Sequence, residues 1–313
     1  MNLKKKKTII AVSVITGACV LAVSAFANYS TANGYDVYKK GIKSLIGQEN
    51  YTLNATASLL TDGEKSLETT LTEKYDRNGE VVLNAVHNSK ELIGECYESG
   101  YREIIQGGKS YYYYNNGENN IWEVNDYRSD RGGTLDLIPA DEKETADKVI
   151  RFAELLTDTV VGDLKNNFIY ISDTESGGAK YSVSLDAIQI PELINAGISA
   201  VCSLNSYDAS YNDNEYYKNL TPSDVDYYLY HDATVKSVSC DFEVDGEGRL
   251  TDNVMTIEIE SEDGHKLEMK FEINVSDFGT TVPEALDPNA KVVDYQAEYK
   301  AIYDTEAETA IEE

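Results

Sequence analysis

The chain has 313 residues, with 27 Lys and Arg against 55 Asp and Glu, and a formal net charge of −28 at pH 7. A surface of this sign repels phosphate backbones and anionic lipid headgroups, which excludes nucleic acid as a partner. The length is enough for one large domain or two small ones, and burying a sizeable core presents no difficulty.

The N-terminus has the features of an export segment. Four lysines at positions 4–7 precede an uncharged run over residues 8–27, which ends in Ala25-Phe26-Ala27. Small side chains at 25 and 27 fit a signal peptidase, so residues 1–27 are predicted to be a signal peptide. The same run would just span a bilayer core about 30 Å thick, which leaves an uncleaved N-terminal membrane anchor open. Under either interpretation the remaining chain is extracytoplasmic, and it is secreted or tethered to the cytoplasmic membrane by this segment.

A spacer over 28–34 leads to the expected folded domain, which spans 35–283. From Tyr35 to Ile46 apolar residues recur at helical spacing, which predicts a helix of about three turns. The spacing then changes to two residues, which predicts half-buried strands in an antiparallel meander over 50–125. The expected strands are 51–59, 67–75, 80–88, 104–105, 111–114 and 121–124, with turns at Asp62-Gly63 and Asn78-Gly79.

Helical spacing returns in the middle of the chain. Apolar residues on one face predict a long helix over 142–165. Pro191 suits a first helical turn, so a second helix is predicted over 191–205. Residues 206–219 are rich in Tyr, Asp and Asn, and we expect a polar surface loop there.

A hairpin and a second meander contain the remaining strands. Residues 168–172 and 181–185 are expected to pair around Gly177-Gly178. Strict alternation over 234–276 predicts an antiparallel meander with one wet face. The sequence leaves open whether the two meanders form one sheet. Residues 284–313 are interpreted as an acidic tail, a marginal helix that frays into disorder.

Three cysteines follow the export segment: Cys96, Cys202 and Cys240. An odd count cannot close completely, although one disulfide is allowed outside the cytoplasm. Small buried hydrophobes are the preferred interpretation, and the disulfide state stays open.

The search for a metal or catalytic site gives one weak pattern. Five residues match a calcium-loop spacing, but strands are expected on both sides where an EF-hand needs helices, so a hairpin turn is favoured. The histidines at 87, 231 and 265 have no metal-ligand spacing, and no hydrolase or P-loop motif occurs. We therefore predict no catalytic residue, metal or cofactor, and a protein that is not an enzyme. The calcium-loop residues are Asp241, Glu243, Asp245, Gly246 and Asp252.

The 24 tyrosines allow two interpretations. A tyrosine ring stacks while its hydroxyl forms hydrogen bonds, so these residues could line a sugar or peptide surface. Tyrosine is also a good β former, which is the preferred interpretation for the run at 111–114.

The order of elements over about 35–282 resembles the LolA-like superfamily, whose members include lipoprotein carriers and envelope-stress sensors. The Gly-Gly-Lys-Ser-Tyr-Tyr-Tyr-Tyr run at 107–114, followed by Trp122, looks like a strand pair of such proteins. Residues 181–200 are similar to uncharacterised exported proteins of Gram-positive anaerobes. The resemblance implies an α+β fold, with a curved antiparallel β-sheet forming a half-barrel wrapped on a few helices.

In that fold the sheet leaves an apolar concavity, which can take an acyl chain or the hydrophobic part of a partner. The leading hypothesis is a non-enzymatic envelope protein that binds a hydrophobic small molecule, a lipid or an envelope protein there. The alternative is a surface or sensor domain that acts through protein contacts on its acidic, Tyr-rich loops at 206–231. A hydrolase is the least favoured class. Neither the ligand-binding residues nor the oligomeric state follows from the sequence.

Overall fold

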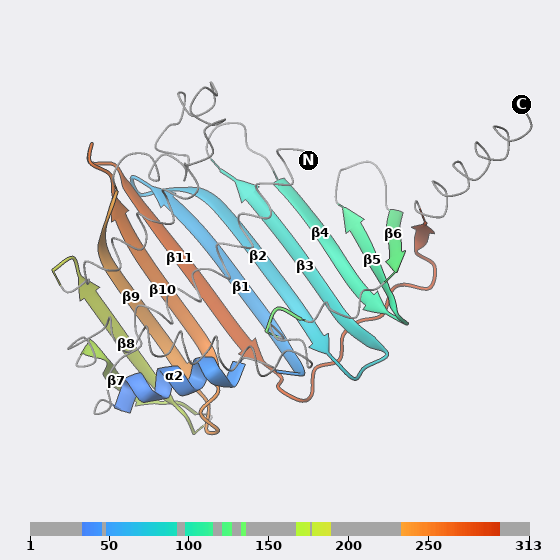
Figure 1. Cartoon of the computed structure of the whole chain (residues 1–313), viewed down its shortest axis with the longest axis horizontal. Coiled ribbons are helices and arrows are strands. Elements are labelled where there is room, and N and C mark those ends of the chain that lie inside the picture. The colour runs from blue at the N-terminus through green and yellow to red at the C-terminus, as the bar shows by residue number, and fades with distance from the viewer. Residues whose placement is uncertain are drawn as a thin grey trace, which may run out of the picture.

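Twelve β-strands and a single α-helix make up the regular secondary structure in the described part of the computed structural model (Figure 1). The structure describes residues 33–45, 48–92, 98–114, 121–126, 133–135, 167–175, 177–188 and 233–294. The predicted helices 142–165 and 191–205, the loop 206–231 and the export segment 1–27 lie outside these residues.

The first meander is confirmed. The buried positions of β1 alternate with more exposed ones at Asn54 and Thr56, as a half-buried strand requires. Asp62 and Gly63 both have positive φ values, 51° and 86°, which is the backbone conformation that a tight hairpin turn needs. The strands are β1 (Asn50–Thr61), β2 (Glu64–Asp76), β3 (Val81–Glu91), β4 (Glu98–Gln106), β5 (Lys109–Tyr114) and β6 (Ile121–Asp126).

The predicted hairpin and the second meander are also present. The hairpin consists of β7 (Ile169–Asp173) and β8 (Ala179–Asp186), and the meander of β9 (Thr234–Val244), β10 (Leu250–Glu260) and β11 (Lys266–Ser276). The hairpin extends the meander, because β8 pairs with β9 in antiparallel register.

The two meanders form one sheet. β1 pairs antiparallel with β11, from Thr52 opposite Ser276 to Thr61 opposite Leu267. The strand order is β12-β6-β5-β4-β3-β2-β1-β11-β10-β9-β8-β7, so the sheet is open, with edges at β12 and β7. Figure 1 shows the blue strand β1 beside the orange strand β11 in the middle of the sheet.

The predicted fold class is confirmed only in its coarser part. The sheet is largely antiparallel, but it is one open 12-stranded sheet, and the described residues contain one helix, α2 (Asn33–Leu45). The described part is therefore mostly β, and the "few helices" of the α+β prediction reduce to one within it. No helix among the described residues is long and apolar enough to cross a membrane.

One face of the sheet, here called the inner face, carries the core. Helix α2 packs on this face mainly against β9 and β10, and Tyr38 places its ring 4.6 Å from that of Phe242. The ring of Tyr181 stacks on the other side of Phe242 at 5.2 Å, and Phe168 meets it edge-on. Gly41 allows the close approach of the helix, since a Cβ there would lie 3.3 Å from the Cβ of Leu250.

Cys240 lies in this core, as the small-hydrophobe interpretation predicted. Its side chain is buried on β9, with Sγ 3.1 Å from the Asn253 Oδ1 atom. The hydroxyl of Tyr38 donates a hydrogen bond to the same oxygen. Cys96 and Cys202 lie outside the described residues.

The start of the predicted tail belongs to the sheet. Glu284 forms an ion pair with Lys74, and its carbonyl accepts a hydrogen bond from the Asn84 side chain. The N–H of Leu286 donates to the Gln106 side chain, and the chain then forms β12 (Lys291–Val293), parallel to β6. Residues 284–294 therefore lie along the sheet, with a turn at 288–289 before β12, where a marginal helix was expected, because side chains of the sheet supply hydrogen-bond partners.

Phe242→Ala tests the aromatic core. Phe242 is 2% exposed and three rings contact it, so the truncation is expected to lower the free energy of unfolding by about 3–5 kcal/mol. Ile169→Ala is the control, because Ile169 is 60% exposed and the change should stay within about 0.5 kcal/mol. Urea denaturation measures both, and equal effects would contradict this core.

Candidate functional site: a buried carboxyl group on the inner face

The most unusual polar group of the inner face is the carboxyl group of Glu73. Glu73 lies on β2 between the inward side chains of Leu71 and Tyr75, and it is 4% exposed. Its cross-strand neighbours are Leu53 on β1 and Ala85 on β3, which are both buried. A charged residue is almost never buried without partners, so the site has to satisfy this carboxyl group with hydrogen bonds.

Three donors do so. The hydroxyl of Tyr51 donates to Glu73 Oε1 at 2.5 Å, and the backbone N–H of Thr134 donates to the same oxygen at 2.7 Å. The Thr134 hydroxyl donates to Oε2 at 2.7 Å. The Tyr51 oxygen also accepts a hydrogen bond from the N–H of Leu135 at 2.9 Å. Residues 133–135 are thereby fixed against β1 and β2.

Gly133 makes this contact sterically feasible. A Cβ at this position would lie 2.3 Å from the Tyr51 hydroxyl oxygen and 2.7 Å from the ring of Tyr75. Real Cβ atoms do not approach other atoms so closely, so only glycine fits here. The buried carboxyl group therefore acts together with a glycine to hold a segment far away in the sequence.

Burial decides the electrostatics of the cluster. It raises the pKa of Glu73 above its ordinary value, and the carboxylate of Glu103 on the next strand but one raises it further, while the three hydrogen bonds act in the opposite direction. Burial also raises the pKa of Tyr51, with a further contribution from Glu73, so Tyr51 remains a neutral donor. The cluster can hold a proton, but the described residues contain no group of His, Cys, Asp and Glu that could bind a metal ion.

His87 extends the polar part of the inner face. It is two residues beyond Ala85 on β3, and its ring stacks on that of Tyr101 at 4.1 Å and 13°. Burial lowers the pKa of His87 to about 4. The imidazole is therefore neutral at pH 7 and can take part in an aromatic stack without carrying charge.

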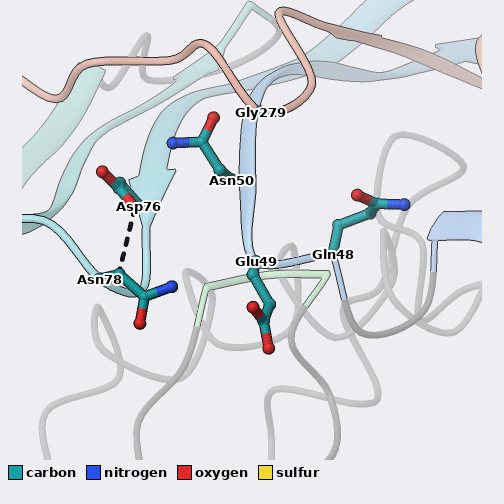
Figure 2. Close-up of a pocket in the computed structure, with 6 residues that line it drawn as sticks. All are labelled: Gln48, Glu49, Asn50, Asp76, Asn78 and Gly279. Carbon is teal, nitrogen blue, oxygen red and sulfur yellow. Dashed lines mark hydrogen bonds between the residues drawn. The ribbon is translucent and has the colours of Figure 1, made fainter.

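An open polar depression of about 540 Å³ lies at the ends of β1 and β2 (Figure 2). Figure 2 shows that its side chains point in different directions, and the Asp76 carboxylate accepts a hydrogen bond from the N–H of Asn78. Asn50 is already engaged, because its side chain exchanges hydrogen bonds with the backbone of Thr281. The depression therefore lacks converging groups for a ligand. Its lining residues are Gln48, Glu49, Asn50, Asp76, Asn78 and Gly279.

The calcium-loop residues form the hairpin that was favoured over a calcium site. Asp241, Glu243 and Asp252 lie on the paired strands β9 and β10, and Asp245 closes the turn between them. One Asp245 oxygen accepts hydrogen bonds from the N–H groups of Glu247 and Arg249, and the other binds the Arg249 guanidinium. These bonds lower the pKa of Asp245 despite partial burial.

His265 does not join the inner-face cluster. His265 lies at the turn between β10 and β11, with Nδ1 2.8 Å from the Asp62 carboxylate. The N–H of Lys266 also donates to Asp62, and both contacts lower the pKa of that carboxyl group. His231 lies outside the described residues.

Sequence reasoning missed Glu73 and Glu103. Both were lost among 55 acidic residues, yet each occupies an inward position of an alternating strand. The available signal was the position of Glu73 between Leu71 and Tyr75. Residues two apart on a strand point to the same face, so Glu73 was expected to point inward with them.

Comparisons with known proteins add little. No family model matches this chain, and no curated protein matches it. One similar solved structure is a beta-barrel-like protein of domain of unknown function DUF1849 from Brucella abortus, at 10% identity over 74% of this chain and 100% of that chain, with a TM-score of 0.20. Another is a putative outer membrane lipoprotein-sorting protein domain from Vibrio parahaemolyticus, at 10% identity over 81% and 94% of the two chains, with a TM-score of 0.19. The resemblance to LolA-like proteins is thus supported only as a weak structural match, too weak to carry an argument.

Glu73→Gln tests the electrostatics of the buried site. The amide can keep the three hydrogen bonds, since its oxygen accepts from Tyr51 and from the Thr134 N–H while its nitrogen donates to the Thr134 hydroxyl. Because the pKa of Glu73 is raised above the ordinary 4.5, its contribution to stability is fully present below that value and is lost as the pH rises through the folded-state pKa. Relative to Glu73→Gln, the wild type is therefore expected to lose stability as the pH rises above 4.5.

Glu73→Leu is the matched variant for the hydrogen bonds. It leaves the Tyr51 and Thr134 donors buried without an acceptor, at a cost of about 1–3 kcal/mol for each. Urea denaturation at several pH values measures all three proteins. A difference between wild type and Glu73→Gln that does not change with pH would contradict the raised pKa.

Proposed function

We propose that this protein is a non-enzymatic, extracytoplasmic binding protein that holds a hydrophobic ligand, such as an acyl chain, or the hydrophobic part of a partner against the inner face of its sheet. The export segment predicted over 1–27 supports an extracytoplasmic site of action. An enzyme is not proposed, because the buried carboxyl group at 73 is occupied by three donors of the protein itself.

One observation carries this proposal. The inner face stays apolar at Leu71, Leu83 and Ile105, on strands β2 to β4, whereas the main contacts of α2 are with β9 and β10. These side chains are at most 5% exposed, so an apolar ligand would bind here in place of the protein groups that now bury them. Ala85, at 1% exposure, is a small side chain in the middle of this area.

Burial of apolar surface is the favourable term for such a ligand. Each buried methylene contributes about 0.8 kcal/mol, so ten of them contribute about 8 kcal/mol before the entropic cost of association. That cost is about 4–15 kcal/mol, so measurable binding requires most of an acyl chain to be buried on this face.

A second candidate function is a surface or sensor domain that works through protein contacts. Its support is the edge strand β7, where Ile169, Tyr170 and Ile171 are each more than half exposed. Exposed apolar edge strands accept a further strand from a partner. The loop at 206–231, for which this role was first expected, lies outside the described residues.

Ala85→Leu and Val86→Leu form a matched pair for the binding proposal. These neighbours point to opposite faces of β3, so Ala85→Leu fills the inner face while Val86→Leu changes only the outer face. Displacement of a fluorescent 16-carbon fatty acid from delipidated protein is expected to become at least tenfold weaker in Ala85→Leu and to stay unchanged in Val86→Leu.

Two measurements keep this test decisive. The melting temperature of each variant shows whether the fold is kept, and Ala85→Val is the smaller change if leucine is not accommodated. Native mass spectrometry of residues 28–313 from the exported fraction reports on bound lipid independently. Delipidated wild-type protein that binds no fatty acid, together with a clean protein mass, would remove the proposal and favour the contact-mediated alternative.

A further inference from the structure

The outer face of the sheet, opposite the inner face, carries a small pocket next to an aromatic pair. The pocket has a volume of about 130 Å³ and lies over β3, β4 and β5. The rings of Tyr113 and Trp122 lie beside it, with centroids 5.5 Å apart and an angle of 41° between the ring planes. The pocket is lined by Asn88, Gly100, Tyr101, Arg102 and Tyr113.

Strand register places a guanidinium group and two aromatic rings in one row. Arg102 on β4 is opposite Tyr113 on β5, and Tyr113 is opposite Trp122 on β6. Directly opposite residues of antiparallel strands share a face and approach within about 5 Å at Cβ. The row therefore presents a cation at one end and two aromatic rings, tilted by 41° to each other, at the other.

Arg102 is electrostatically unusual for this chain. Among the arginines that the structure describes, Arg77 pairs with Glu49 and Arg249 pairs with Asp245 and Glu247, while Arg102 is exposed and forms no ion pair. Neither of its direct neighbours on the same face, Val86 and Tyr113, is a carboxylate. The protein has a net charge of −28, which disfavours anions over most of its surface. An anion that reaches Arg102 meets a positive charge, and none of the described direct neighbours on this face is a carboxylate.

The size of the pocket limits what enters it. The pocket has about 130 Å³ where the depression at the ends of β1 and β2 has about 540 Å³, which suits a small polar group such as a carboxylate. Gly100 keeps the floor open, since a Cβ there would lie 2.7 Å from the Asn88 Oδ1 atom. The Asn88 side chain therefore lies over Gly100 and brings an amide to the pocket wall.

We propose that this outer-face pocket binds the carboxylate of an acidic sugar unit, whose ring lies on Tyr113 and Trp122. Arginine matches a carboxylate with two parallel hydrogen bonds, which gives direction as well as attraction. Aromatic rings offer an apolar face for the ring carbons, while the Asn88 amide can bond to sugar hydroxyls. This site is on the face opposite to the proposed acyl-chain site, so either can exist without the other.

Isothermal titration calorimetry with trimers of galacturonic acid and of glucuronic acid tests this inference. The methyl ester of the same galacturonic trimer is the matched neutral probe. At least one acidic trimer is expected to bind the wild type, with the ester at least tenfold weaker. Arg102→Gln is expected to remove this preference, and Trp122→Ala to weaken both probes. Arg77→Gln is the control and should bind like the wild type, because Arg77 pairs with Glu49 at another position.

Each other outcome overturns the inference. If neither acidic trimer binds at millimolar concentration, the pocket is not a site for such sugars. Equal binding of trimer and ester shows that the Arg102 charge is not used. A carboxylate-terminated tripeptide that binds as tightly as the trimers shows a carboxylate site without sugar recognition. Melting temperatures of all variants confirm that the fold is kept.

Discussion

The pairing of β1 with β11 is the contact on which the rest of the structure depends. It joins strands more than 200 residues apart and keeps them in register from Thr52 and Ser276 to Thr61 and Leu267. Without it, the two meanders would be separate sheets, each with an additional exposed edge. With it, the inward residues of β1 and β11 meet, and the core runs without interruption from the helix end of the sheet to β4. The seam thereby creates the continuous apolar face on which the proposed binding function relies.

The inner face accepts one polar exception near this seam. Glu73 is directly opposite Leu53 of β1, and desolvation of its carboxyl group costs free energy that the hydrogen bonds from Tyr51 and Thr134 offset. These bonds fix residues 133–135 to the sheet. Glycine is the only residue type that fits at position 133, because a Cβ there would clash with Tyr51 and Tyr75. The same arrangement makes Glu73 a poor catalyst, because its oxygens are already committed to the protein. A structural anchor is therefore the role that the geometry supports for this carboxyl group.

Local patterns predicted most of the described elements. Alternating apolar residues and Asp-Gly turns determine strands such as β9 and β10, since side-chain direction and turn conformation depend on neighbouring residues. The partner of β1 was not predictable in this way, because a strand periodicity says which face is buried but not which distant strand lies beside it. The docking of residues 284–294 along the sheet was missed for a similar reason. Its partners are side chains of Lys74, Asn84 and Gln106, which no local pattern connects to it.

The site was less predictable than the fold. Glu73 could have been found from its inward position, but its partner Thr134 lies 61 residues away in a stretch without strand periodicity. The pocket at Arg102 depends on four strands being in register, and the tyrosine run at 111–114 suggested only good β formers. Tyr113 and Tyr112 point to opposite faces because alternate residues of a strand do so, and only the register shows that Tyr113 shares a face with Arg102.

Amide hydrogen exchange under native conditions tests the central pairing most directly. If β1 and β11 form the seam of one sheet, the amides of Asn50–Thr61 and Lys266–Ser276 should exchange with the same high free energy of opening, and that value should fall in both strands when Phe271→Ala weakens β11. Phe271 is 3% exposed and faces Ala57 of β1. Amides of β1 that exchange much faster than those of β11, or that do not respond to the change in β11, would contradict a single continuous sheet.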